Sequence, residues 1–268
     1  MPTFLKTHRA YSLVTAVLTL IAAVLRILSV TLFTERTSGY FKSAAVLPHL
    51  THAFMALSAL CLLLYPFLLQ PRPEARSAKH TPAMTASALL CALLFFVNFI
   101  NACLTETALP GLLLALTFLT LLCGTLYFVL QLPSFKATPT LLTVFGGFAI
   151  MALACLVALT YFDITTPMNA PHKTELHLAL LAAMLYLVYE LRNVAKIPMP
   201  RMLAAGGALA FFLATTVGLS NLLGYAVGVY QSPLYLAEDL LLLALAVYVC
   251  ARSYTNTTKK SDRKDSAT

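Results

Sequence analysis

Eight long apolar stretches, separated by short polar connections, constrain the fold of this 268-residue chain more than any other feature. A helix rises about 1.5 Å per residue, so a stretch of about 20 apolar residues can cross the hydrocarbon core of a bilayer. Membrane strands would alternate in polarity, whereas these stretches are apolar on nearly every side. We therefore predict an all-α, polytopic integral membrane protein with eight transmembrane helices, over residues 10–33, 45–69, 84–103, 110–131, 140–162, 174–192, 202–221 and 234–253.

The composition agrees with a single transmembrane domain, over residues 1–253. Hydrophobic residues make up 60% of the chain and charged residues 10%, far from the composition of a soluble domain. The net charge of +8 resides in the connections and in the C-terminal tail, so we expect a lipid bilayer and not nucleic acid as the partner. The six cysteines form no CxxC pair and suit buried apolar positions.

The distribution of positive charge predicts the orientation, because lysine and arginine remain in the cytoplasm. With both termini cytoplasmic, 14 of the 18 lysines and arginines lie in cytoplasmic segments. Outer segments hold only Arg36, Lys42 and Lys173, and Arg26 lies inside the first span. We expect a plasma membrane of bacterial type. The tail, residues 254–268, is basic and nearly free of apolar residues, which predicts a disordered cytoplasmic segment able to attract anionic lipid.

Ordered landmarks suggest an internal duplication with halves 10–131 and 140–253. Asn98 and Asn221 close the third and seventh spans, and Pro110 and Pro233 precede the fourth and eighth, each pair 123 residues apart. Four spans return the chain to its starting side, so such a 4+4 repeat would be parallel. The acids of the eighth span would then belong to one half only.

Polar residues within the spans gather toward the predicted outer face. A charge near the bilayer centre costs about 2.5–3.5 kcal/mol on insertion scales, so each needs a partner, water or a function. We expect these residues to form a ligand-binding or proton-coupling site. The candidates are Arg26, His49, His52, Asn98, Asn101, Asn221, Glu238 and Asp239.

The sequence leaves the partners of several of these charged residues undecided. Arg26 lies at the level of Glu238 and Asp239, which suits a packing ion pair or contact between the guanidinium and an anionic ligand. Those two acids point about 100° apart, so one can pair while the other faces a cavity. At the start of the sixth span, Glu175 and His177 lie nearly opposite, and either could join the cluster but hardly both.

Other polar residues have a structural or a metal-binding interpretation. Asn98 and Asn101 share a helix face and suit hydrogen bonds between helices. His49 and His52 also share a face and could hold zinc together with Glu238, although no HExxH motif is present. On the cytoplasmic side we interpret Tyr189, Glu190 and Arg192 as interfacial anchors, and we expect the glycine pairs 146–147 and 206–207 to permit close helix packing.

The sequence favours a binding protein over an enzyme. No nucleotide loop, nucleophile elbow or haem-attachment motif occurs, and we expect no cofactor. The leading hypothesis is small-molecule or ion binding, for secondary transport or sensing, at an outward-facing polar site. The scarcity of polar groups in the inner half favours sensing. A membrane-embedded metal-dependent hydrolase and a membrane scaffold or assembly partner are the alternatives.

Overall fold

The computed structural model describes residues 8–35, 39–42, 45–68, 81–104, 111–163, 166–167, 169–230 and 233–258. Within these ranges the chain forms helices, turns and one isolated bridge between Thr34 and Phe41, with no sheet. The predicted all-α polytopic fold is confirmed. The eight helices are α1 (His8–Phe33), α2 (Val46–Leu68), α3 (Pro82–Leu104), α4 (Gly111–Leu130), α5 (Pro139–Phe162), α6 (Pro171–Val194), α7 (Pro200–Ala226) and α8 (Pro233–Thr258).

Seven of the helices, α1 to α7, are long and apolar enough to cross a membrane by length and composition, as judged over the described residues. The eighth, α8, differs because Glu238, Asp239 and Arg252 all fall within it. It nevertheless runs beside α7 and α3 through the bundle. Its role as the eighth span stays a prediction that this packing supports.

Prolines fix the beginnings of several helices. Pro139, Pro171 and Pro200 occupy the first turn of α5, α6 and α7, where the missing N–H removes no helical hydrogen bond. At α5 the hydroxyl of Thr138 also accepts a hydrogen bond from the backbone N–H of Leu141, at 3.3 Å. These helices therefore begin within three residues of their predicted starts.

Two boundaries differ from the predictions in ways that matter. α6 begins at Pro171, not at residue 174, which brings His172 and Lys173 into its first turn. α8 continues to Thr258, five residues beyond the predicted end of the last span at residue 253, and the disorder of the tail stays a prediction. A helix that has already formed adds further turns at little cost, even beyond the apolar stretch. The remaining tail, residues 259–268, lies outside the described part of the chain.

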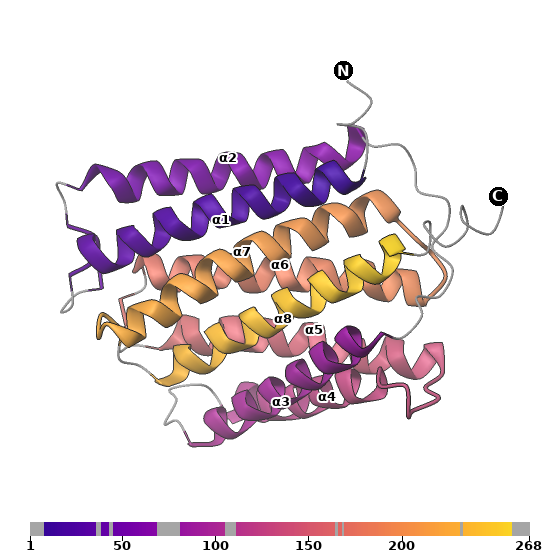
Figure 1. Ribbon diagram of the computed structural model, residues 1–268. Coiled ribbons are helices and arrows are strands. Elements are labelled where there is room, and N and C mark those ends of the chain that lie inside the picture. Colours follow the sequence, from indigo (N-terminus) through magenta and orange to yellow (C-terminus); the bar gives the residue numbers. More distant parts are fainter. Residues whose placement is uncertain are drawn as a thin grey trace.

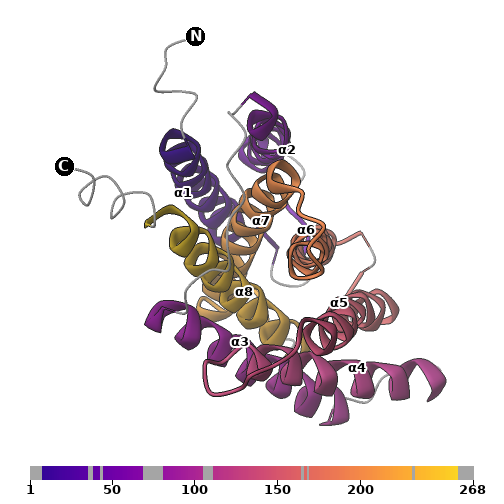
Figure 2. The same cartoon turned by 90° about the vertical axis from the view of Figure 1, so that its right-hand side faces the viewer.

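The helices run side by side in a layered bundle (Figure 1). Seen from its end, α1 and α2 lie on one side, α3, α4 and α5 on the other, and α6, α7 and α8 between them (Figure 2). α7 packs against four neighbours, α1, α2, α6 and α8. The start of α1 and the end of α8 lie at the same end of the bundle, as an even number of spans requires.

The packing does not show the predicted duplication. In parallel halves related by a two-fold axis, α2 and α3 would pair as α6 and α7 do. Instead α6 packs along α7, whereas the described residues of α2 pack on α1 and α7. The third helix, α3, lies across the bundle from α2, beside α8 and α4 (Figure 2). The repeat is therefore not confirmed. Asparagines and prolines near helix ends recur in membrane proteins for local reasons, which explains matching landmarks without a common fold.

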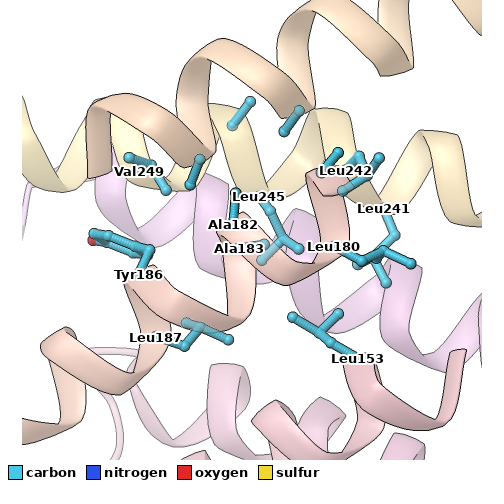
Figure 3. Packing of buried hydrophobic residues seen from close by; sticks show 14 of the residues in the cluster. Leu153, Leu180, Ala182, Ala183, Tyr186, Leu187, Leu241, Leu242, Leu245 and Val249 are labelled. Atoms are coloured by element: carbon cyan, nitrogen blue, oxygen red, sulfur yellow. The ribbon is translucent and has the colours of Figure 1, made fainter. Parts of the chain in front are cut away.

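Apolar side chains fill the centre of the bundle between α5, α6 and α8 (Figure 3). Leu153, Leu180, Leu187, Leu241 and Leu245 are each at most 2% exposed. Alanines at neighbouring positions, which are also buried, allow the helices to approach closely. This layer separates the polar groups at the two ends of the bundle.

The glycine pairs act in close packing, as expected, but not every member contributes. A Cβ at Gly206 would lie 3.5 Å from the backbone Cα of Tyr186, so α7 approaches the backbone of α6 here. A Cβ at Gly146 would collide with the side chain of Leu191, whereas one at Gly147 would meet nothing within 4 Å. Only the first glycine of that pair faces a neighbour.

Gly218 should be the most sensitive of the glycines in α7. A Cβ there would lie 3.0 Å from the backbone oxygen of Asp239 and 2.9 Å from Leu243, so α7 and α8 would have to separate. We expect Gly218→Ala to lower the free energy of unfolding by about 1–3 kcal/mol. Gly147→Ala is the matched control, because it adds the same methyl group in open space. Equal melting temperatures for the two variants would contradict this account.

Candidate functional site

Buried polar side chains gather at the end of the bundle where α1, α3, α5 and α7 end and the other helices begin. We call this the outer end, after the predicted orientation, and the group the outer polar layer. Its members come from five helices and from the connection before α8. They are Arg26, His52, His172, Glu175, Asn221, Tyr225, Tyr230, Tyr235, Glu238 and Asp239.

An ion pair between α1 and α6 lies at the centre of this layer. Arg26 Nε donates to Glu175 Oε2 at 2.6 Å, and the Arg26 side chain is fully buried. His52 Nε2 lies 2.6 Å from the other carboxylate oxygen, Oε1, while 40% of its side chain remains exposed. Arg26 Nη1 and Nη2 are buried and make no hydrogen bond of regular geometry with the described residues, although the guanidinium interacts with the Tyr230 hydroxyl. The triad thus joins three helices through one carboxylate.

The connection between α1 and α2 folds back over this triad. The bridge between Thr34 and Phe41 turns the chain so that the Phe41 ring lies 5.2 Å from the guanidinium carbon of Arg26. The same ring lies 5.7 Å from the imidazole of His52. An aromatic face beside a cation is a favourable contact, and it also excludes water from the ion pair.

A second group surrounds Asp239 on α8. Asn221 Nδ2 donates to Asp239 Oδ1 at 2.9 Å, and His172 Nε2 lies 3.4 Å from Oδ2. The imidazole stacks on Tyr230, with ring centroids 4.2 Å apart, and lies 4.9 Å from the ring of Tyr235. Asp239 is therefore held by polar partners from α6 and α7.

Tyr230 connects the two groups. Burial raises the pKa of its hydroxyl to about 12, although the nearby Arg26 guanidinium opposes this rise. The hydroxyl therefore stays protonated at physiological pH and remains a hydrogen-bond donor. A Cβ at Gly224 would lie 2.6 Å from the Tyr230 ring, so this glycine leaves the space that the ring occupies.

Glu238 differs from every other acid in the layer. Its side chain is fully buried, and both carboxylate oxygens have no hydrogen-bond partner in the described part of the chain. It interacts electrostatically with two further acids, Asp239 and Asp163. Taking an unpaired carboxylate out of water is costly, so such a group must bind a proton, a cation or a hydrogen-bond donor.

The structure brings most of the predicted site residues together but changes their partners. Arg26 pairs with Glu175, so the expected pairing with Glu238 or Asp239 is wrong. Asp239 instead contacts His172 of α6 and Asn221 of α7. Asn98 serves packing, because its Nδ2 donates to the backbone oxygen of Ala237 at 3.0 Å. Asn101, one turn further along α3, is partly exposed.

The histidines named in the sequence analysis have different surroundings. His49 is exposed, whereas His52 contacts Glu175, so the two do not converge with Glu238 on one point. Over the described residues, no group of three or more histidines, cysteines or acids is placed to hold a metal ion. His177 bonds to Thr160 at 2.8 Å and stays apart from the triad. The expectation that only one of Glu175 and His177 joins the cluster is confirmed.

Sequence reasoning missed part of the contribution of α6. His172 and Glu175 lie three residues apart in its first two turns and therefore face the same side. Lys173 is also buried, with Nζ donating to the backbone oxygens of Asp163 at 2.9 Å and Thr166 at 3.4 Å. The predicted span began at residue 174, so it included Glu175 but left His172 and Lys173 in the connection before it.

A second polar cluster lies at the opposite, inner end and overturns the expectation of few polar groups there. Glu190 is 2% exposed, and its Oε1 accepts from Tyr248 at 2.6 Å and from Arg252 Nε at 3.0 Å. Tyr248 also lies 2.6 Å from Gln131 Oε1. Glu190 is therefore a buried link between α6 and α8, not an interfacial anchor.

Comparison with known proteins identifies no relative: no family model, no curated protein and no solved structure matches the chain. The geometry of the described residues therefore carries the functional argument. It establishes a multi-pass helical membrane protein with a buried polar layer at one end of its bundle.

Proposed function

We propose that this protein binds a small molecule or an ion in the outer polar layer, as a secondary transporter or a sensor. One observation carries the proposal: the carboxylate of Glu238 is fully buried and both its oxygens lack a hydrogen-bond partner among the described residues. A buried carboxyl in this state weakens the fold unless something binds to it. Such groups inside transmembrane segments commonly mark ion, proton or substrate pathways.

The scaffold alternative predicts that the polar groups satisfy one another. Arg26, Glu175, Asp239 and Asn221 largely do so, but Glu238 does not. The hydrolase alternative requires His49, His52 and Glu238 to converge, and the described residues do not place them so. Binding therefore accounts for more of the site than either alternative.

The orientation and lipid contacts form part of the same proposal. We place both termini in the cytoplasm and the outer polar layer toward the outside of a bacterial plasma membrane, on the charge distribution of the sequence. The basic tail then faces anionic lipid. The inner cluster of Glu190, Tyr248 and Arg252 then lies toward the cytoplasmic side, where it links α6 to α8.

The proposal is tested by screening the purified protein in lipid nanodiscs against a broad panel of salts, amino acids, amines and organic acids. We expect at least one class of compound to raise the melting temperature in a saturable manner, because a ligand that binds only the folded state stabilises it. Glu238→Gln, which keeps the shape and removes the charge, should abolish that stabilisation. No stabilising compound in the whole panel would refute the proposal, and uptake by proteoliposomes would separate transport from sensing.

A further inference from the structure

We infer that the ligand of the outer polar layer carries an ammonium group, which binds at Glu238; this inference rests on the proposed function. The charged residues that interact in this part of the structure include two bases, Arg26 and Lys173, and four acids, Asp163, Glu175, Glu238 and Asp239. These described residues therefore carry more negative than positive charge when the histidines are neutral.

Both bases already have an acid partner. Arg26 pairs with Glu175 at 2.6 Å. Lys173 binds the backbone of Asp163 and interacts electrostatically with its carboxylate. Of the two remaining acids, Asp239 is held by His172 and Asn221, whereas Glu238 has no hydrogen-bond partner within the described residues. Glu238 is therefore the acid at which a positively charged ligand gains most.

The hydrogen-bonding state of Glu238 also favours a cationic donor. Its oxygens Oε1 and Oε2 are buried acceptors without a donor in the described residues. An ammonium group supplies N–H donors and one positive charge, and therefore satisfies acceptors that a carboxylate or phosphate ligand would leave unsatisfied. Arg26, the group best suited to an anion, already has its charge balanced by Glu175.

Aromatic side chains at this end of the bundle add a second element of recognition. Tyr225 and Tyr235, on α7 and α8, lie within range of electrostatic interaction with the Glu238 carboxylate. Together with Tyr230 these tyrosines surround His172, with ring centroids 4.2 to 6.3 Å from the imidazole. Aromatic rings favour an organic ammonium ion over an anion.

Glu238 is fully buried in this conformation, so an amine reaches it only when the outer end opens.

The test uses the full chain in nanodiscs with three probes at equal ionic strength: ethylammonium chloride, sodium chloride and sodium acetate. We expect ethylammonium alone to raise the melting temperature. Glu238→Gln should weaken its apparent affinity about 10- to 100-fold, which corresponds to the loss of one charge-assisted hydrogen bond. Glu190→Gln, which neutralises a buried acid at the inner end, should leave the ethylammonium affinity unchanged.

The outcomes separate this inference from the proposed function. Stabilisation by acetate that disappears in Arg26→Met would overturn the ammonium assignment and keep a ligand site in the layer. An ethylammonium effect that survives in Glu238→Gln would also overturn the assignment. A lack of response to all three probes, with a hit elsewhere in the broad panel, would reject the ammonium class alone.

Discussion

Arg26→Met is expected to lower the free energy of unfolding by about 3–5 kcal/mol, because it leaves the buried carboxylate of Glu175 without its main counter-charge. Met retains much of the apolar volume of the arginine stem, so the loss of stability comes mainly from the removal of the positive charge. His52 alone compensates Glu175 poorly, since 40% of its side chain is exposed. Unfolding of the purified protein in mixed detergent, followed by circular dichroism, measures the effect.

The double variant Arg26→Met, Glu175→Leu supplies the control. Replacing both members of a buried ion pair by apolar residues is often neutral, so most of the lost stability should return. Stability in the double variant that equals the sum of the two single losses would show that the pair at 2.6 Å does not couple α1 to α6.

Arg252→Met should have the next largest effect, at the inner end. Its Nε lies 3.0 Å from Glu190 Oε1, and the Arg252 side chain is 20% exposed. Removing it leaves the buried Glu190 without its counter-charge. Because water partly reaches this pair, we expect the free energy of unfolding to fall by only about 2–3 kcal/mol, below the range for a fully buried pair. The hydrogen bond from Tyr248 remains in the variant.

Arg201→Met is the matched control for this prediction, because Arg201 is exposed at the beginning of α7 on the same side. It should change the stability by less than about 0.5 kcal/mol, as exposed substitutions usually do. Similar losses for the two variants would argue against Glu190 and Arg252 as a structural link between α6 and α8.

The secondary structure could be predicted because the bilayer imposes a simple rule on the sequence. Each span needs about 20 apolar residues, and prolines and charges lie where the spans end. For this reason α2, α3, α4 and α5 begin and end within about two residues of the predicted limits. The start of α6 was less accurate, because His172 and Lys173 resemble a polar connection until their partners are known.

The sequence by itself determined that this chain is a multi-pass helical protein. It did not indicate the second buried polar cluster, around Glu190, at the opposite end of the bundle. The hydropathy of a segment depends only on residues that are close in the sequence, so the sequence alone shows which segments can span a membrane. Only the tertiary structure decided that Arg26 pairs with Glu175, that α7 packs on α6 while α2 is distant from α3, and that Glu238 is left without a partner. These outcomes depend on which helices become neighbours and how each is rotated, and apolar segments of similar composition carry little information about either.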